Sequence, residues 1–242
     1  MIALSIVIPA YNEAAFIGTL LERIAAVDLA ALDVSREIIV VDDGSRDATA
    51  DIAEQHAGVR VLRQRPNAGK GAAVRVGIAA ATGTHVLIQD ADLEYDPRDY
   101  LPMLAALRRG DGAIAVYGSR YLNPAGPDGR ARMRLGPWPG QSWPAFLGGR
   151  SLSLAASLTT GRFLTDTVTA LKLVPRELVA GLDLQTTGFE LDHEISAKIL
   201  ARGVRIEEVP IGYQPRSKAE GKKIGAKDWW RALRTFWRFR RG

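Results

Sequence analysis

The stretch Val86-Leu87-Ile88-Gln89-Asp90-Ala91-Asp92-Leu93-Glu94 joins a short apolar run to a group of carboxylates. The apolar run predicts a buried β-strand, which places Asp90 and Asp92 at the C-terminal end of that strand. Mg²⁺ and Mn²⁺ prefer oxygen ligands and usually complete their shell with water and substrate phosphates. The sequence therefore predicts a site for Mg²⁺ or Mn²⁺ at Asp90 and Asp92, with Glu94 as a third or water-mediated ligand. An acidic turn that only begins a loop is the alternative.

Strand-like and helix-like segments alternate before this stretch. Apolar runs at residues 4–8, 37–41 and 59–62 predict three more strands. Apolar residues between the runs recur at helical spacing; they are Ile17, Leu20, Leu21, Ile24, Ala48, Ile52, Ala53, Val74, Ile78 and Ala81. We therefore expect an α/β fold with a mostly parallel central sheet flanked by helices. Ligands of such sheets bind beyond the carboxyl ends of the strands, so the polar residues that follow the strands should share one crevice.

Four polar motifs follow the predicted strands in a fixed order. They are Pro9-Ala10-Tyr11-Asn12-Glu13, Val41-Asp42-Asp43-Gly44-Ser45, Asn67-Ala68-Gly69-Lys70-Gly71 and Asp90-Ala91-Asp92. In this order they resemble the inverting family 2 glycosyltransferases of the GT-A fold, most closely the dolichyl- and polyprenyl-phosphate sugar synthases. Further matching motifs extend the resemblance over nearly the whole chain; they are Tyr117-Gly118-Ser119-Arg120-Tyr121, Gly188-Phe189-Glu190, Glu208-Val209-Pro210-Ile211-Gly212-Tyr213 and Glu220-Gly221-Lys222-Lys223-Ile224.

The resemblance implies a UDP- or GDP-sugar as the donor. The residues implied for donor binding are Pro9, Ala10, Tyr11, Glu13, Asp42, Asp43, Asn67, Lys70, Gly71, Asp90 and Ala91. Asp42 or Asp43 would accept the ring imino hydrogen of uracil or guanine. Lys70 would reach the diphosphate or ribose from the start of a helix, where free N–H groups also favour anions. Lys70 is not a P-loop lysine, because that motif needs Ser or Thr where Gly71 stands.

The resemblance also implies how the donor bond is broken. A metal ion at Asp90 and Asp92 would bridge the donor diphosphate, and with Arg120 it would stabilise the charge growing on the departing nucleoside diphosphate. The residues predicted to be catalytic are Asp92 and Arg120, which act on the leaving group, and Asp166 and Asp192, which are candidate bases. A nucleotide-sugar-binding or membrane-recruitment module without turnover is the non-catalytic alternative, because metal-site residues bind as well as catalyse.

A phosphate-bearing acceptor needs cations rather than a general base, because a phosphate monoester has a second pKa of about 6 and is already a nucleophile. The residues that the resemblance implies for the acceptor phosphate are Arg150, Ser153, Arg216, Lys222 and Lys223. A hydroxyl of a glycolipid or lipid-linked glycan is the alternative acceptor, with Asp166, Asp192 or Glu190 as the base. Relatives carry Gly-Phe or Cys-Tyr where this chain has Ala170-Leu171, so the acceptor specificity is open at this point.

Composition favours one catalytic domain, residues 1–215, followed by a basic tail, residues 216–242. The chain has 242 residues, 47% of them hydrophobic, which is enough to bury a full core. It has no cysteine, which excludes disulfides and thiolate metal sites. No apolar run approaches the ~20 residues that span a bilayer, and the first residues do not resemble a signal peptide. We expect a cytoplasmic protein, peripheral on the inner face of the cytoplasmic membrane.

The tail has the composition of a membrane-surface helix. Residues 216–242 contain ten Lys or Arg and two acidic residues, while the whole chain has a net charge of +5. A helix from Ala226 would place on one side Trp229, Trp230, Leu233, Phe236 and Trp237, and on another Lys227, Arg231, Arg234, Arg238 and Arg241. This pattern is typical of a helix in an anionic membrane interface. A helix docked on its own domain is the alternative; no nucleic-acid-binding module accompanies the basic residues.

Two segments before the tail carry other signals. Residues 123–144 are rich in proline and glycine, which predicts a mobile flap without regular structure. Residues 145–158 are the most apolar late stretch, but Gly148, Gly149 and Arg150 interrupt it. We expect this stretch to form a helix or loop on the acceptor side of the active site.

Overall fold

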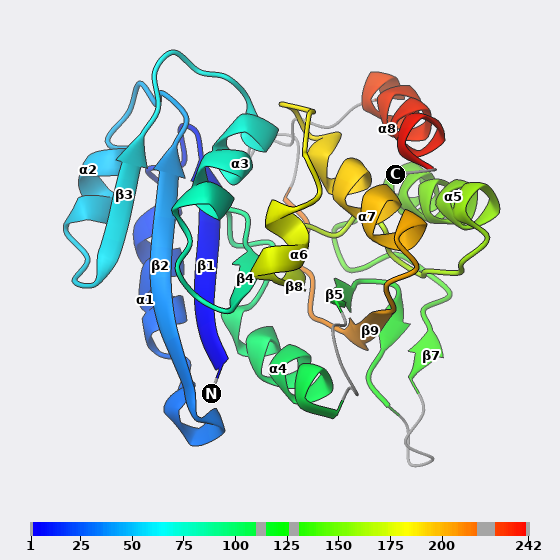
Figure 1. Ribbon diagram of the computed structural model, residues 1–242, viewed down its shortest axis with the longest axis horizontal. Helices are drawn as coiled ribbons and strands as arrows, with labels where there is room; N and C mark the ends of the chain where they lie inside the picture. The colour runs from blue at the N-terminus through cyan, green and yellow to red at the C-terminus, as the bar shows by residue number, and fades with distance from the viewer. Residues whose placement is uncertain (1, 110–114, 126–130, 217–225, 241–242) are drawn as a thin grey trace. The chain divides into compact units, whose positions relative to one another are not determined.

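The computed structural model describes residues 2–109, 115–125, 131–216 and 226–240. The chain forms two compact units, one of residues 1–93 and 170–191 and the other of residues 94–169 and 192–242. This division differs from the boundary predicted at residue 215, because the helix that begins at Ala226 belongs to the second unit. Figure 1 shows the chain with most of its helices and strands labelled.

Five strands form the sheet of the first unit. In spatial order they are β3 (Val59–Arg63), β2 (Val34–Asp42), β1 (Ile2–Ala10), β4 (His85–Ile88) and β8 (Lys172–Pro175). The first four run parallel, and β8 pairs antiparallel with β4. The last seven residues of β1 and the last five of β2 are buried, which is typical of a parallel sheet covered on both faces. The four strands predicted from the sequence are confirmed.

Helices cover both faces of this sheet, with α1 on one face and α3 on the other (Figure 1). The helices of this unit are α1 (Ile17–Ala25), α2 (Thr49–Glu54), α3 (Lys70–Ala80) and α6 (Arg176–Ala180), with a 3₁₀ turn, η1 (Ala30–Leu32). The predicted apolar positions of α1 are buried because their spacing places them on one helix face. α3 lies very close to β1: a side chain at Gly77 would collide with Val7, so glycine permits the approach.

The second unit contains two short strand pairs. β5 (Ala115–Ser119) pairs parallel with β9 (Ile206–Pro210), and β6 (Leu122–Asn123) pairs antiparallel with β7 (Arg132–Met133). The helices are η2 (Pro97–Asp99, a 3₁₀ turn), α4 (Tyr100–Arg109), α5 (Trp143–Thr160), α7 (Leu191–Ala201) and α8 (Ala226–Phe239). Because β7 lies within residues 123–144, the prediction that this segment has no regular structure is wrong.

α5 has clear signals at both of its ends. The Ser142 hydroxyl accepts a hydrogen bond from the N–H of Ala145 at 3.4 Å, and Pro144 occupies the first turn. Gly161 ends the helix in the left-handed conformation, with φ of 70°. Of the two forms predicted for residues 145–158, the helix is therefore the one that the chain adopts.

α8 packs against its own unit. This is the alternative that was predicted for the basic tail, a helix docked on its own domain. Phe236 and Phe239 form a buried cluster with Ala156 of α5 and Ala197 of α7. The membrane-facing role predicted for Phe236 is therefore wrong, because this side chain is fully buried. No helix in the described part of the chain combines the length and the apolar character needed to cross a membrane.

Candidate active site

Asp43 fixes the loop that leads into α3. Its two carboxylate oxygens accept hydrogen bonds from the backbone N–H groups of Ala68 and Gly69, each at 2.8 Å. The side-chain amide of Asn67 donates to the backbone oxygen of Asp43 at 2.8 Å. Asp43 is buried, and these bonds offset the cost of burying its charge. Asp43 thus shapes the predicted donor loop, while its contact with the nucleotide base stays a prediction.

The backbone of residues 186–188 crosses the start of α3. Gly69 has φ of +98°, and a Cβ atom there would collide with the carbonyl oxygen of Thr187. A Cβ atom at Gly71 would lie 2.8 Å from the carbonyl oxygen of Gly188. The motif from Asn67 to Gly71 therefore contains glycine because two backbone segments meet there.

The loops after β1 and β2 hold each other in place. The N–H of Asn12 donates to the Ser45 hydroxyl at 2.9 Å, and the Asn12 side-chain oxygen accepts from the N–H of Arg46 at 2.8 Å. Asp42 accepts a hydrogen bond from the N–H of Ser45 at 3.3 Å, and Tyr11 is partly exposed. Other residues predicted for donor binding are buried; they are Pro9, Ala10, Glu13, Gly71 and Ala91.

Lys70 and Asp90 are brought together beyond the end of β4. The Lys70 Nζ atom lies 2.7 Å from a carboxylate oxygen of Asp90 and 5.8 Å from the ring centre of Phe189. Asp92 is 5% exposed. Lys70 and Asp90 therefore form an ion pair, while the donor and metal-binding roles of Lys70, Asp90 and Asp92 stay predictions.

The acidic residues at this strand end fit a hard divalent cation that takes part of its shell from a substrate. Asp90 and Asp92 supply oxygen donors, and Mg²⁺ is commonly bound by one or two carboxylates with phosphates and water. Among the described residues, no three His, Cys, Asp or Glu side chains group closely enough to hold a metal by themselves. Glu94 lies in the second unit, where it accepts hydrogen bonds from the Tyr213 hydroxyl at 3.0 Å and the Arg216 N–H at 2.8 Å. Its predicted ligand role stays a prediction.

Arg120 and Asp166 form a forked ion pair in the second unit. Nε and Nη2 of Arg120 lie 2.7 and 2.8 Å from the two Asp166 oxygens, and the Arg120 N–H donates to the same carboxylate at 3.1 Å. Burial alone would lower the pKa of Arg120, but the charge of Asp166 holds that pKa well above its ordinary value. Arg120 therefore stays cationic. Because both oxygens of Asp166 accept bonds from Arg120, this carboxylate is poorly placed to act as a base.

Glu208 holds the loop that carries Asp166. Its carboxylate accepts hydrogen bonds from the N–H groups of Thr165 and Asp166 at 2.7 and 2.8 Å, and from the Thr165 hydroxyl at 2.9 Å. Burial raises the pKa of Glu208, although these hydrogen bonds act in the opposite direction. Glu208 positions Asp166 and, through it, Arg120. No individual role was predicted for Glu208 from the sequence; the signal that marks this residue is its place in an ordered motif.

Tyr213, from the same motif, packs against Arg120. The guanidinium carbon of Arg120 lies 5.2 Å from the centre of the Tyr213 ring, which suits a cation–π contact. The Tyr213 ring also lies 5.7 Å from that of Tyr95. Like Glu208, Tyr213 was missed as an individual residue and is marked only by the motif that contains it.

A pocket beside α5 contains two of the residues predicted for the acceptor phosphate. It has a volume of about 320 Å³, and its lining includes Leu147, Arg150, Ser153, Leu154, Phe163 and Leu164. The guanidinium carbon of Arg150 lies 5.6 Å from the ring centre of Tyr121. The Ser153 hydroxyl accepts a hydrogen bond from the N–H of Thr167 at 3.1 Å. A cation and a hydroxyl between apolar walls suit an anionic group attached to a hydrocarbon chain.

The remaining cations predicted for the acceptor are placed in part. Nε of Arg216 lies 3.8 Å from Glu94, whereas Lys222 and Lys223 lie outside the described residues. Arg134 was not predicted; its guanidinium carbon stacks 3.8 Å from the ring centre of Trp138. Arg134 and Trp138 lie within residues 123–144, which were predicted to have no regular structure, so the sequence gave no signal that the two side chains stack.

The first turn of α7 carries Asp192, one of the acids predicted as a base, and Glu194. Glu194 lies 2.7 Å from Lys198, and both side chains are almost fully buried. Asp192 is 7% exposed at a helix start, where acids are favoured. Glu190 lies in the first unit, where its carboxylate lies beside Gly188. The base roles of Asp192 and Glu190 stay predictions, while Glu194 is committed to its ion pair.

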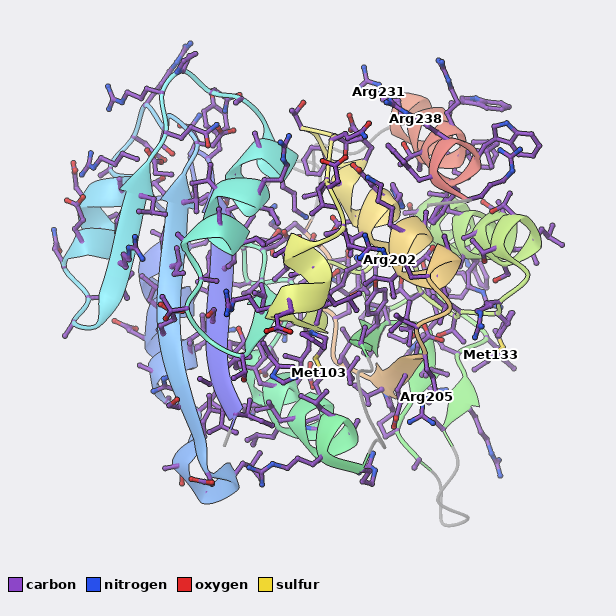
Figure 2. The ribbon with its side chains drawn as sticks, in the orientation of Figure 1. Met103, Met133, Arg202, Arg205, Arg231 and Arg238 are labelled. Carbon is purple, nitrogen blue, oxygen red and sulfur yellow. The ribbon has the colours of Figure 1, made fainter. Side chains whose placement is uncertain are left out.

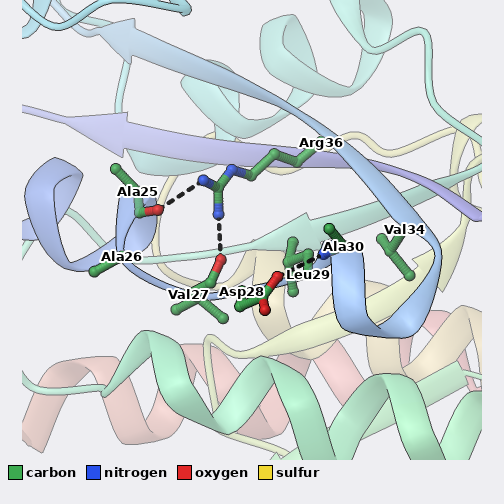
Figure 3. Close-up of a pocket in the computed structure, with 8 residues that line it drawn as sticks. All are labelled: Ala25, Ala26, Val27, Asp28, Leu29, Ala30, Val34 and Arg36. Carbon is green, nitrogen blue, oxygen red and sulfur yellow. Dashed lines mark hydrogen bonds between the residues drawn. The ribbon is translucent and has the colours of Figure 1, made fainter.

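A larger cavity lies away from these residues, where α1 is joined to β2 (Figure 3). Its volume is about 420 Å³. The Arg36 guanidinium donates to the carbonyl oxygens of Ile24, Ala25 and Val27 at 2.7, 2.8 and 2.8 Å. These bonds satisfy carbonyl groups at the C-terminal end of α1, so Arg36 acts as a helix cap. None of the predicted site residues lines this cavity.

Several proteins of known activity are similar to this chain. A dolichol-phosphate mannosyltransferase of Pyrococcus furiosus is 29% identical over 231 residues, which cover 91% of this chain and 59% of that protein. A dodecaprenyl-phosphate galacturonate synthase of Rhizobium johnstonii is 37% identical over 118 residues, 47% of this chain and 35% of that protein. A dolichyl-phosphate hexose transferase of Haloferax volcanii is 31% identical over 215 residues, 88% and 84% of the two chains. The chain thus spans about three-fifths of the Pyrococcus protein.

Solved structures share the fold. Glucosyl-3-phosphoglycerate synthase of Mycobacterium tuberculosis, in complex with UDP, has a TM-score of 0.69 at 23% identity, covering 97% of this chain and 77% of that one. Mannosyl-3-phosphoglycerate synthase of Rubrobacter xylanophilus has a TM-score of 0.71 at 21% identity, covering 98% and 72%. These likenesses and the mostly parallel sheet confirm the predicted GT-A architecture. Since the family model of Glycosyl transferase family 2 matches residues 5–164, the chain belongs to that family and is a glycosyltransferase.

Proposed function

We propose that this chain transfers a sugar from a UDP- or GDP-sugar to a polyprenyl phosphate and inverts the anomeric centre. The names of three relatives specify dolichol phosphate, dodecaprenyl phosphate or dolichyl phosphate, which supports this acceptor class. The observation that carries the proposal is the pocket beside α5, where Arg150 and Ser153 lie between Leu147, Leu154 and Phe163. A prenyl phosphate combines the same two chemistries, an anionic head and a hydrocarbon chain.

The transfer needs no protein base when the acceptor is a phosphate. A phosphate oxygen attacks the anomeric carbon and forms the new C–O bond, while the bond to the donor diphosphate breaks and its electron pair leaves with the nucleoside diphosphate. Arg150 holds the attacking phosphate. Arg120, kept cationic by Asp166, stabilises the charge that develops on the leaving group.

The first unit supplies the donor site in this proposal. Asp90 and Asp92 would hold Mg²⁺ or Mn²⁺, which when bound supplies Lewis-acid stabilisation of the leaving diphosphate. A fold relative has been solved with UDP and Mn²⁺ and with UDP and Mg²⁺, which supports a divalent cofactor. Lys70, 2.7 Å from Asp90, contacts the diphosphate, and Asp42 or Asp43 contacts the base.

The lipid acceptor also favours a membrane location. We infer that the enzyme lies peripherally on the anionic inner face of the cytoplasmic membrane. The basic segment of residues 216–242 supports this, because clustered Lys and Arg attract anionic lipid headgroups.

A hydroxyl acceptor is the second candidate, and the buried Asp192 carboxylate is the observation that favours it. With such an acceptor, Asp192 must lose its proton to act as a base, so the rate rises with pH on the acidic limb of the pH–rate profile. Asp192→Asn would remove that limb. With a phosphate acceptor the profile keeps its shape, because no side chain takes up a proton.

The test uses the purified full chain with Mn²⁺ or Mg²⁺, a panel of radiolabelled UDP- and GDP-sugars, and short-chain polyprenyl phosphate. We expect label in the organic extract only when the lipid phosphate is present, and a loss of at least about 100-fold in Asp92→Asn. Glu22→Gln, at an exposed position of α1, is the matched control and should transfer at the original rate. Donor-dependent transfer to hydroxyl acceptors alone would refute the lipid-phosphate acceptor.

A further inference from the structure

α5 exposes a stripe of large apolar side chains. Trp143, Leu147, Leu154 and Leu158 are 57%, 56%, 55% and 78% exposed. Their positions, i, i+4, i+11 and i+15, lie on one side of the helix. Several large apolar side chains exposed on one helix face indicate an interaction site, whereas single exposed apolar residues are ordinary.

α8, which packs against α5, also exposes tryptophans. Trp230 and Trp237 are 63% and 61% exposed, although the opposite face of α8 is buried against α5 and α7. The Trp229 indole N–H donates to the hydroxyl of Ser151, midway along α5, at 2.9 Å. The ring centres of Trp229 and Trp230 are 4.8 Å apart, so Trp230 lies next to the tryptophan that contacts α5.

α8 also exposes arginine side chains. Arg231, Arg234 and Arg238 are exposed, and Figure 2 labels Arg231 and Arg238 on this helix. Tryptophan side chains favour the boundary between lipid headgroups and hydrocarbon, and guanidinium groups favour anionic headgroups. The outer face of α8 therefore presents both chemistries together.

We propose that the α5–α8 surface, formed by the apolar stripe of α5 with the exposed tryptophans and arginines of α8, binds an anionic lipid bilayer. The proposal deepens the proposed function and rests on its lipid acceptor. It differs from the face expected of α8 alone, because Phe236 is buried and α5 supplies four of the six exposed apolar side chains of this surface. A second copy of the chain fits this surface less well, because a two-fold contact would bring the arginines of both copies together.

The α5–α8 surface adjoins the acceptor pocket. Leu147, Leu154 and Phe163 line the pocket that contains Arg150, and they are also 56%, 55% and 64% exposed. A bilayer bound here leaves the prenyl chain in the lipid while its phosphate reaches Arg150. Membrane binding then lowers the cost of acceptor capture, because the hydrocarbon chain never enters water.

The test measures co-sedimentation of the full chain with vesicles of phosphatidylcholine containing phosphatidylglycerol, and with vesicles of phosphatidylcholine alone. We expect binding to the anionic vesicles that weakens as salt rises. Leu158→Ser and Trp237→Ser should each reduce partitioning at least tenfold. Leu135→Ser is the matched control, because Leu135 is 90% exposed but lies outside the surface, and it should bind as the unsubstituted chain does.

A second readout separates this proposal from the proposed function. Leu158→Ser and Trp237→Ser should keep the original rate of transfer to a water-soluble, short-chain prenyl phosphate, because neither residue lines the acceptor pocket. The two proposals can also fail separately. If the original chain binds vesicles, the two variants do not, and the original chain transfers sugar to no prenyl phosphate, the membrane-binding surface is supported and the proposed acceptor is refuted.

Three results would overturn the proposal. The first is vesicle binding by Leu158→Ser and Trp237→Ser at the original level. The second is equal binding to neutral and anionic vesicles. The third is a dimer in solution that both substitutions dissociate, which would make the α5–α8 surface a contact between copies of the chain.

Discussion

Arg120 and Arg150 approach the same aromatic ring. Their guanidinium carbons lie 5.7 and 5.6 Å from the ring centre of Tyr121, so the proposed leaving-group cation and acceptor cation share one neighbour. A Cβ atom at Gly149 would collide with the Tyr121 hydroxyl, which explains a glycine within α5. Only Arg120 has a forked carboxylate partner, so its position is fixed more rigidly.

At this scale we predict that Arg120→Lys lowers kcat by at least about tenfold, because lysine keeps the charge but not the planar fork that binds Asp166. Steady-state kinetics with the lipid-phosphate acceptor measures the change. Arg98→Lys is the control, since Arg98 is 83% exposed and pairs with Asp96 at 2.6 Å. An unchanged kcat in Arg120→Lys would remove Arg120 from the catalytic machinery.

Asp99 has a carboxyl group whose ionisation opposes folding. Burial raises its pKa to about 6 from the ordinary 3.8, although the N–H of Gly212 donates to it at 3.0 Å. The folded state therefore holds this proton more tightly than the unfolded state does. The contribution of Asp99 to stability is greatest below about pH 4 and falls as the pH rises to about 6.

The prediction concerns Asp99→Asn, which keeps an acceptor oxygen for Gly212 and removes the charge. One pKa unit corresponds to ~1.4 kcal/mol. The free energy of unfolding of Asp99→Asn, relative to that of the original chain, should therefore be higher at pH 7 than at pH 4 by up to ~3 kcal/mol. Urea unfolding at both pH values measures this gain, with Asp51→Asn as an exposed control. Equal pH dependence in Asp99→Asn and the original chain would contradict the raised pKa.

At the scale of elements, β9 reaches the active site through its side chains. Glu208 binds the N–H groups of Thr165 and Asp166, and the segment that follows β9 places Tyr213 against Arg120. One strand and its extension thus hold Arg120 from two sides. The sequence indicated residues 208–213 only as a matching motif. The partners of Glu208, Thr165 and Asp166, lie more than forty residues away in the chain, so no local pattern could reveal them.

We predict that Glu208→Gln lowers kcat about 10- to 100-fold while KM for the donor changes little, because the amide nitrogen cannot accept a backbone N–H bond and the Asp166 loop loosens. The free energy of unfolding should fall by ~1 to 3 kcal/mol. Glu207→Gln is the matched control on the same strand, where the side chain makes only a 3.7 Å pair with Arg109. Equal loss in kcat and in donor affinity would indicate a general structural role instead.

At the scale of the whole molecule, donor binding should be coupled to stability through the metal. We predict that UDP or GDP together with Mn²⁺ raises Tm, because a ligand present at 100 times its Kd stabilises the folded state by about 2.7 kcal/mol. Thermal unfolding with nucleotide and Mn²⁺, with nucleotide and EDTA, and with Asp92→Asn measures the effect. The shift should vanish in the last two cases; a shift that survives EDTA would argue against metal-mediated binding.

The sequence by itself determined the four parallel strands of the first unit, the order of the polar motifs and the family. Continuous apolar runs such as those of β1 and β2 form buried parallel strands whatever their partners, and the motifs lie directly after them. α1 was equally predictable, because one helix face carries all of its buried residues. These are local properties, which depend only on residues close together in the chain.

Only the tertiary structure decided which charged groups meet and which helix faces are buried. Asp166 pairs with Arg120 across 46 residues, and Asp43 binds the loop before α3 across 25 residues. α8 buries Phe236 and exposes Trp230 and Trp237, a choice that its own amphipathic pattern left open. Contacts between distant residues depend on how packed elements bring them together, and burial then selects the carboxylates and cations that can satisfy one another.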